Sequence, residues 1–297
     1  MAGERPGPEV FPKVSYEWFA SAASRDSQVP VGFVPLERVF GTSVRFSPGQ
    51  KIHDVAAGTG RSLQYILTKV PPEIARTLKL VASEPSTENH EVLRRRAAFN
   101  VEIIEKDAVE AIAEVKNCDL IFFINAIHLL GDGDKVAAIR AAYDSLVPGG
   151  LFVVSSTFIK DGVPEEEKEF FDKWPFNTFK ALGEFGENPR EVIRRVRENK
   201  LIFWSSEQYQ QAFEEAGFGV EMEMATMPCT LESIEGICHY SVWNGHTIPG
   251  VEAERAVDIS LRGLHTTWEG MKRDKDYIVN RNTMVIVGRK PQLPAAA

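Results

Sequence analysis

The stretch IHDVAAGTGRS, residues 52–62, places a carboxylate and two glycines between strand-forming residues and the start of a helical pattern. The residues after it, RSLQYILTKV, carry apolar side chains at helical spacing. Gly58 and Gly60 permit a sharp turn, and such a turn points free backbone N–H groups and a helix N-terminus toward a bound group. We therefore expect a ligand cradle at residues 56–60, although glycines selected only for turning would give the same pattern.

Two further acidic residues follow apolar, strand-like segments. Glu84 comes after LKLVAS, 24 residues beyond Gly60, where a carboxylate in a nucleotide-binding sheet binds both hydroxyls of a ribose. Asp107 comes after VEIIE and can accept from an exocyclic amine such as N6 of adenine, while Ala108 offers a backbone N–H. For either acidic residue alone, a helix cap or a solvated side chain is the preferred interpretation. Together, in this order, they indicate an adenosine site.

Strand-like and helical segments alternate from residue 51 to residue 158. Apolar strands separated by amphipathic helices are typical of an α/β fold with a doubly wound parallel sheet, covered on both faces. In such a sheet, ligands bind beyond the carboxyl ends of the strands. The glycine turn, Glu84 and Asp107 all follow strands, so we expect them at the same edge.

HDVAAGTG resembles the first motif of the class I S-adenosylmethionine-dependent methyltransferases, with Asp54, Gly58 and Gly60 in register. LVASEPS, EKDAVE, CDLIFFINAIHLL and LVPGGLFVVSST are similar to the motifs that follow, and EAGFGVEMEMA and NTMVIVGRKP are similar to the last two strands. The resemblance implies a seven-stranded sheet with six parallel strands and one antiparallel strand. It also implies S-adenosyl-L-methionine as the cofactor. The cofactor-binding residues it implies are Asp54, Ala56, Gly58, Gly60, Glu84, Asp107, Ala108 and Asn125.

One residue departs from the family's pattern. Ala56 stands where the family often has its first glycine, so we expect the backbone there to avoid positive φ and to leave room for a methyl group. A nicotinamide enzyme is the competing interpretation of a glycine turn followed by a ribose-binding acid. It would normally have a third glycine where this chain has Leu63, so the methyltransferase interpretation is preferred.

Methyl transfer from a sulfonium requires an in-line nucleophile near the methyl group, and a base only when the acceptor must lose a proton. His128, in NAIHLL after the fourth strand, is the candidate catalytic residue, either as that base or as a residue that positions ligand. Asn125 is expected to bind the amino-acid part of the cofactor. The three cysteines are scattered, and no CxxC or histidine-rich cluster predicts a metal site.

The segments outside these motifs are expected to form the acceptor side. We predict an N-terminal helical cap over residues 1–50, the cofactor-binding core over 51–158 and an aromatic-rich lid over 159–204. Residues 205–292 complete the sheet, with a substrate-side insertion at 230–281. Aromatic walls suit a flat or apolar acceptor, but rings that pack only on their own domain give the same composition. The candidate substrate-binding residues are Tyr16, Phe19, Phe170, Phe171, Trp174, Phe179, Phe203 and His239.

Composition narrows the function classes. The chain has 297 residues with 42 acidic and 34 basic side chains, a net charge of −8. Its basic runs, LRRRAAF and REVIRRVREN, read as solvated helix faces, so nucleic-acid binding is not expected. No signal-peptide core or membrane-spanning apolar run is seen, which favours the cytoplasm.

The sequence thus predicts a methyltransferase for a small hydrophobic, aromatic or isoprenoid-like metabolite, of the kind found in secondary metabolism. The predicted partner is this small-molecule acceptor, with neither nucleic acid nor membrane. The N-terminal helix is also a candidate contact in a homo-oligomer. The alternatives are a protein or nucleic-acid methyltransferase and a non-catalytic cofactor-binding homologue.

Overall fold

A computed structural model gives the structure of residues 46–97, 101–198 and 202–292. The chain divides into two compact units. Among the described residues, the first, which we call the sheet unit, comprises residues 46–97, 101–162, 202–227 and 282–292, and the second, the helical unit, comprises residues 163–198 and 228–281. Most of the segments predicted separately as lid and insertion therefore belong to one unit. The predicted N-terminal cap lies almost entirely outside the described residues.

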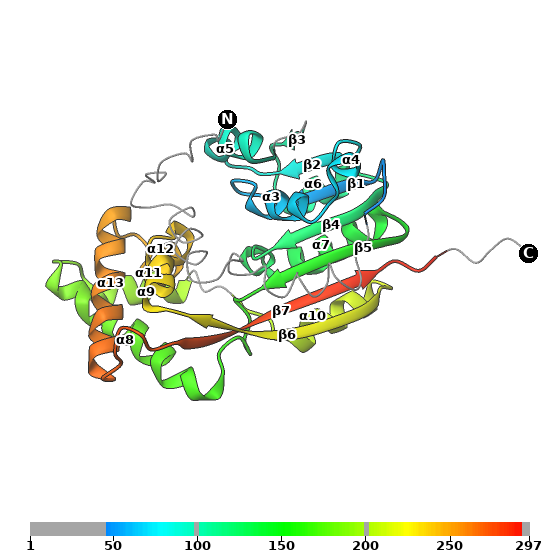
Figure 1. The fold of residues 1–297 in the computed structure, drawn as a ribbon. Coiled ribbons are helices and arrows are strands. Elements are labelled where there is room, and N and C mark those ends of the chain that lie inside the picture. The colour runs from blue at the N-terminus through cyan, green and yellow to red at the C-terminus, as the bar shows by residue number, and fades with distance from the viewer. Residues whose placement is uncertain (1–45, 98–100, 199–201, 293–297) are drawn as a thin grey trace, which may run out of the picture. The chain divides into compact units, whose positions relative to one another are not determined.

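The sheet has seven strands in the order β3-β2-β1-β4-β5-β7-β6, six of them parallel and one antiparallel, which confirms the predicted fold class (Figure 1). The central β1 (Lys51–Val55) pairs in parallel with β2 (Lys79–Ser83) and β4 (Cys118–Ile124). β3 (Val101–Ile104) lies outside β2.

On the other side of β4, β5 (Leu146–Ser156) pairs in parallel with β4 and antiparallel with β7 (Val279–Arg289). The edge strand is β6 (Gly219–Cys229). This arrangement brings the carboxyl ends of β1, β2, β4 and β5 to one edge of the sheet.

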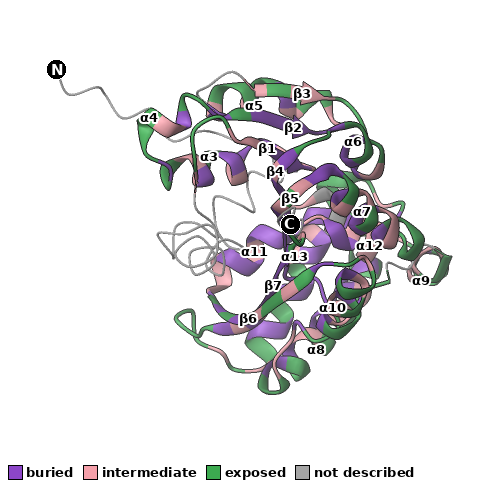
Figure 2. Ribbon diagram, turned by 90° about the vertical axis from the view of Figure 1, so that its right-hand side faces the viewer, coloured by how far each residue is buried: buried purple, intermediate pink, exposed green. Residues whose placement is uncertain are grey.

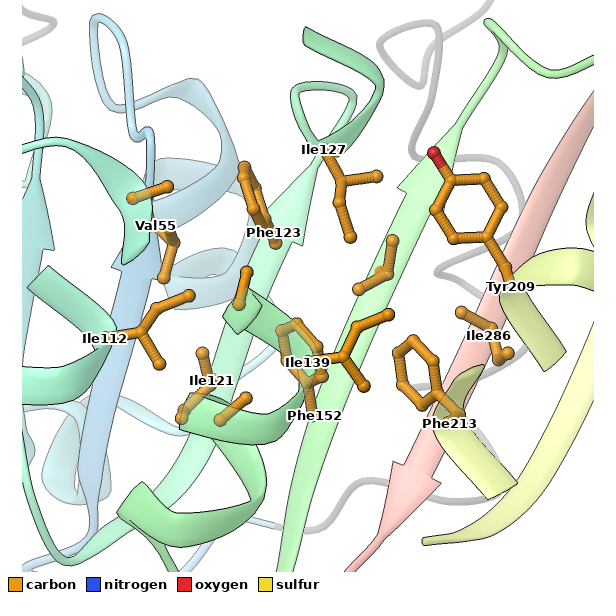
Figure 3. Close-up of a cluster of buried hydrophobic side chains, with 14 of the residues drawn as sticks. Val55, Ile112, Ile121, Phe123, Ile127, Ile139, Phe152, Tyr209, Phe213 and Ile286 are labelled. Carbon is orange, nitrogen blue, oxygen red and sulfur yellow. The ribbon is translucent and has the colours of Figure 1, made fainter. Parts of the chain in front are cut away.

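Helices cover both faces of the sheet. On one face, α6 (Ala108–Glu114), α7 (Asp132–Ser145) and α10 (Ser206–Glu215) pack on alternate residues of the strands (Figure 3). Phe152 of β5 stacks on Phe213 of α10 with ring centroids 5.2 Å apart. Fully burying a side chain of this size contributes roughly 1.5–3 kcal/mol, so these ring contacts stabilise the packing of α10 on the sheet.

The other face of the sheet carries α3 (Arg61–Thr68) and α5 (Thr87–Ala97), which pack against each other. Leu93 of α5 is buried against Ala57 and Ala82. The short α4 (Pro72–Ala75) connects α3 to β2. α3 and α5 begin just after β1 and β2, so their N-termini lie next to the strand ends that the sequence marks as binding loops.

The helical unit contains the short 3-10 helix η2 (Glu165–Glu167) and the helices α8 (Lys168–Glu184), α9 (Pro189–Glu198), α11 (Leu231–Cys238), α12 (Ser241–Thr247) and α13 (Ala253–Gly270). α8 packs along α13, where Gly263 permits the close approach because a side chain there would meet the backbone of Thr178. Glu167 and Arg273 form a buried ion pair with a 2.7 Å N–O distance. The unit thus has its own apolar clusters and its own buried ion pair.

Burial differs between the strands and the helices that cover them (Figure 2). The central strands are buried almost throughout, while the outward faces of the helices are exposed. No helix in the described ranges is long and apolar enough to cross a membrane. In those same ranges, no three His, Cys, Asp or Glu side chains are grouped so as to hold a metal ion. The three cysteines, Cys118, Cys229 and Cys238, are buried free thiols.

Candidate functional site

The glycine turn begins directly after β1. Ala56, Gly58 and Gly60 have φ values of 51°, 55° and 78°. The prediction that Ala56 avoids positive φ is therefore wrong: the turn requires a left-handed residue here, and alanine adopts it at a cost of roughly 1–2 kcal/mol. A methyl group built on Gly58 would meet no atom within 4 Å, so the turn borders open space. Gly60 is the N-cap of α3 and supplies no capping side chain, so no side chain of the N-cap residue covers the start of that helix.

Glu84 joins the glycine turn to the loop after β2. Its buried carboxylate accepts from the backbone N–H of Gly58 at 2.9 Å through Oε2. Oε1 accepts from the N–H of Ser86 at 2.9 Å and from Nδ2 of Asn89 at 3.1 Å. A carboxylate has about four acceptor positions, and three are used here. Two ribose hydroxyls would therefore displace at least one of these donors.

Asp107 and Ala108 lie at the start of α6. Oδ1 of the exposed Asp107 accepts from the N–H of Glu110 at 3.1 Å, which makes Asp107 the N-cap of the helix. The capping role and the predicted adenine contact are compatible because the carboxylate has a second oxygen. The N–H of Ala108, in the first turn, has no intrahelical partner and can donate to a ligand.

Asp54 and His53 are buried in β1. Burial raises the pKa of Asp54, a hydrogen bond from the N–H of Leu63 opposes the rise and the charge of Glu84 adds to it, and the resulting pKa is about 7. His53 was not singled out in the sequence. Its Nε2 lies 3.1 Å from Oγ of Ser83, and burial together with Lys51 lowers its pKa to about 3.

Arg96 is a residue of the site region that the sequence analysis missed. Arg94 and Arg95 are exposed, as expected for LRRRAAF, but Arg96 is half-buried, so the prediction of a wholly solvated face is wrong. Its Nη1 donates to Oγ1 of Thr59 at 2.7 Å and approaches the carbonyl of Thr59 at 3.4 Å. The signal was its position three residues after the buried Leu93, which turns it toward the covered face of α5.

Asn125 lies directly after β4 with φ of 50°. Its N–H donates to the carbonyl of Ser155 at 2.6 Å. Its Oδ1 accepts from the N–H of Thr157 at 3.2 Å and from Oγ1 of Thr157 at 3.1 Å. These bonds join the carboxyl ends of β4 and β5. Because Oδ1 is used, the side-chain NH₂ is the group with which Asn125 can bind the cofactor.

His128 lies in the short 3-10 helix η1 (Ile127–Leu129) after β4 and is 2% exposed. Its Nδ1 is 3.2 Å from Oγ of Ser156 at the end of β5. Its ring lies 4.5 Å from the ring of Phe158 and 6.3 Å from that of Phe203, centroid to centroid. The structure thus brings the predicted residues His128 and Phe203 together and adds Ser156 and Phe158, which the sequence analysis did not name.

The neighbours of Phe203 fix its segment to the sheet unit. Trp204 donates from Nε1 to Oδ1 of Asp132 at 2.8 Å, and its carbonyl accepts from the N–H of Lys160 at 3.0 Å. The segment that begins at residue 202 is therefore tied to the residues just after β5. Phe203, predicted as part of the lid, belongs to the sheet unit.

The other predicted substrate residues belong to the helical unit. Phe170 and Trp174 are 0% and 2% exposed and pack with the half-buried Phe171 in one apolar cluster of that unit. Phe179 is half-buried in a second cluster. His239 is buried at the C-terminal end of α11. Tyr16 and Phe19 lie outside the described residues. Within this unit, Phe170 and Trp174 serve as core side chains.

The sheet order, the antiparallel β7, the glycine turn and the acid after β2 together define the class I S-adenosylmethionine-dependent methyltransferases. Residues 52–150 match the family model described as "Methyltransferase domain". The chain is a class I S-adenosylmethionine-dependent methyltransferase, and S-adenosyl-L-methionine is its cofactor.

A curated relative, carboxy-S-adenosyl-L-methionine synthase of Trichodesmium erythraeum (strain IMS101), is 25% identical over 198 residues, covering 62% of this chain and 74% of the relative. A solved structure from Bacillus halodurans C-125, described as that of a methyltransferase, gives a TM-score of 0.52 at 16% identity, covering 86% of this chain and 99% of that one.

A second solved structure is phosphoethanolamine N-methyltransferase 2 of Haemonchus contortus in complex with phosphomonomethylethanolamine and S-adenosylhomocysteine. It gives a TM-score of 0.53 at 17% identity, covering 94% of this chain and 58% of that one. At these identities the solved structures show the fold.

Proposed function

We propose that the protein transfers the methyl group of S-adenosylmethionine to a small hydrophobic metabolite, of aromatic or isoprenoid-like character, in a cytoplasmic biosynthetic reaction. The observation that carries this proposal is the group of three rings, His128, Phe158 and Phe203, after β4 and β5. These strands end at the same edge of the sheet as the glycine turn after β1. Aromatic walls favour an apolar acceptor and stabilise a nearby positive charge.

The residues of the sheet unit fit the cofactor. The open space at Gly58 and the uncapped start of α3 suit its polar groups, Glu84 and Asp107 carry carboxylates for the ribose and adenine, and the side-chain NH₂ of Asn125 suits a carboxylate. When bound, the cofactor supplies an electrophilic methyl group on a sulfonium. The protein then has to hold the acceptor atom in line and exclude water, and orientation of this kind supplies much of the rate enhancement.

Two observations disfavour a macromolecular acceptor. The net charge is −8, which opposes electrostatic binding of nucleic acid. After β4 the chain reads NAIH, in place of the Asn/Asp-Pro-Pro-Tyr/Phe loop typical of many base and amide methyltransferases. The proposed partner is therefore a small molecule. A homo-oligomer through the N-terminal helix concerns residues outside the described ranges and stays a prediction.

The names of the curated relatives favour a second candidate function. Both are called carboxy-S-adenosyl-L-methionine synthase, a name that refers to a carboxylated form of the cofactor itself. Chemistry on the cofactor would need no separate methyl acceptor. Any test of the proposed function should therefore also analyse the cofactor after the reaction.

The test is incubation of the protein with methyl-labelled S-adenosylmethionine and a cell extract, with the Glu84→Ala variant as the control for the site. The proposal predicts label in the organic phase with wild type and far less with the variant. Label in precipitated polymer would instead support a protein or nucleic-acid acceptor. Cofactor bound but recovered intact would support a non-catalytic homologue, and a cofactor of increased mass would support the second candidate.

A further inference from the structure

Ser156 is the last residue of β5, and its side chain is completely buried. Its Oγ accepts a hydrogen bond from the backbone N–H of Phe158 at 3.1 Å. The same Oγ lies 3.2 Å from Nδ1 of His128. A serine hydroxyl has one proton to donate and two lone pairs. The hydrogen bonds around Ser156 can therefore be counted completely.

The N–H of Phe158 occupies one lone pair of Ser156 Oγ. The hydroxyl proton of Ser156 still needs an acceptor. Among the described residues, Nδ1 of His128 is the acceptor within hydrogen-bond distance of Ser156 Oγ. If Nδ1 carried the imidazole proton, it would donate to Ser156, and the buried hydroxyl proton would have no partner in the described part of the chain. Buried polar groups are rarely left in that condition, because the lost hydrogen bonds to water are not replaced.

We propose that Ser156 is a positioning residue that fixes neutral His128 as the tautomer protonated at Nε2. The lone pair of the imidazole then points at Ser156, and Nε2 presents a proton to whatever group faces it. His128 therefore acts as a hydrogen-bond donor and does not remove a proton from the acceptor. The tautomer stands on the geometry alone, whereas its role in catalysis rests on the proposed function.

The consequence concerns the chemistry of the acceptor. A neutral amine or a thiolate needs no base for methylation, and a hydroxyl or carbon acid needs one. Because the lone pair of neutral His128 is engaged at Nδ1, this site favours methyl transfer to an acceptor that needs no deprotonation, such as a neutral amine or a thiolate.

The tautomer can be measured directly by nuclear magnetic resonance of protein labelled with ¹⁵N-histidine, at a pH where the imidazole is neutral. The His128→Gln variant assigns the signals of this residue. We expect a protonated Nε2 and an unprotonated Nδ1 in wild type, and a larger share of Nδ1-protonated ring in Ser156→Ala.

The matched control for the spectra is Ser83→Ala, because Ser83 makes the corresponding contact with His53. It should leave the His128 signals unchanged. Nδ1-protonated His128 in folded wild-type protein would overturn the proposal. The measurement needs no turnover, so an absence of methyl transfer would contradict the proposed function without affecting this result.

The catalytic consequence is tested by comparing His128→Gln with His128→Ala in single-turnover methyl transfer. Glutamine keeps an N–H donor near the position of Nε2 but has no basic nitrogen. We expect His128→Gln to stay within roughly tenfold of the wild-type rate, with His128→Ala clearly slower. A base would contribute about a hundredfold or more, so an equal loss of that size in both variants would contradict the donor role.

Discussion

Gly58 and Gly60 both have positive φ but differ in their surroundings, and this difference can be tested. Both have positive φ, which a residue with a side chain adopts at a cost of roughly 1–2 kcal/mol. A Cβ on Gly58 would meet nothing within 4 Å, whereas a Cβ on Gly60 would lie 3.2 Å from Cγ and 3.3 Å from Cα of Leu93. A side chain at position 60 would thus press on α5 as well as strain the backbone, whereas one at position 58 would only strain the backbone.

We therefore predict that Gly60→Ala lowers the free energy of unfolding more than Gly58→Ala does. Gly58→Ala should cost about 1–2 kcal/mol through backbone strain alone. Gly60→Ala should cost more because Leu93 must also move. Urea denaturation of the two variants without cofactor measures both values, and equal losses would show that Leu93 accommodates the methyl group freely.

At the level of residues, the sequence was sufficient to predict the place of side chains that directly follow a strand. It was not sufficient for side chains whose partners lie on a second element. Glu84 follows β2 and Asp107 follows β3, so their places in the loops could be predicted from alternation of strands and helices. Arg96 and Ser156 acquire their partners only when α5 reaches the glycine turn and β5 lies beside β4. No local pattern encodes those distances.

At the level of elements, α5 supports the glycine turn although it carries none of the predicted cofactor-binding residues. Arg96 reaches back from its last turn to Thr59, inside the glycine turn. A hydrogen bond from a charged group contributes roughly 1.5–3 kcal/mol. Part of this energy should hold the turn in its binding conformation.

We predict that Arg96→Gln weakens binding of S-adenosylhomocysteine by about tenfold, because the shorter neutral side chain leaves Thr59 less firmly held. Arg94→Gln, on the exposed face of the same helix, is the matched control and should bind as wild type does. Calorimetric titration of both variants gives the comparison. If the two variants bind with the same affinity, the contact with Thr59 has no part in cofactor binding.

The elements themselves were well predicted where hydrophobic period and glycine turns agree. The strands from β1 to β5 and the antiparallel β7 follow from apolar runs and from the family resemblance. The helical unit was not predicted as one unit. Residues 163–198 and 228–281 form its apolar clusters together, which requires pairing of α8 with α13 across the 68 residues from 185 to 252. The aromatic residues of α8 that composition assigned to an acceptor wall include Phe170 and Trp174, which belong to one of these clusters.

At the level of the whole molecule, His53 and Asp54 give the stability opposite dependences on pH. The pKa of Asp54 rises from 3.8 to about 7, so between these values the folded protein keeps a proton that the unfolded chain has lost, and stability falls as pH rises. The pKa of His53 falls from 6.5 to about 3, so between these values the unfolded chain keeps the extra proton, and stability rises with pH. The two slopes oppose each other from about pH 4 to pH 6.5.

Removing one group should expose the slope of the other. In Asp54→Asn, the free energy of unfolding should rise from pH 4 to pH 6.5 by up to about 3 kcal/mol more than it does in wild type. In His53→Gln it should fall relative to wild type over the same range. Urea denaturation of the three proteins at several pH values tests this, and parallel pH profiles for all three would show that neither group titrates as its burial requires.

We propose that the loops after β1 and β2 bind the adenosine part of the cofactor, with Glu84 holding the ribose. Calorimetric titration of S-adenosylhomocysteine into wild type, Glu84→Ala and the exposed-control variant Glu88→Ala tests it most directly. We predict binding at one site per chain in wild type and in Glu88→Ala, and about tenfold to a hundredfold weaker binding in Glu84→Ala. The lower end is favoured because the ribose exchanges with donors that Glu84 already binds. Unchanged affinity in a folded Glu84→Ala protein would show that Glu84 does not hold the ribose.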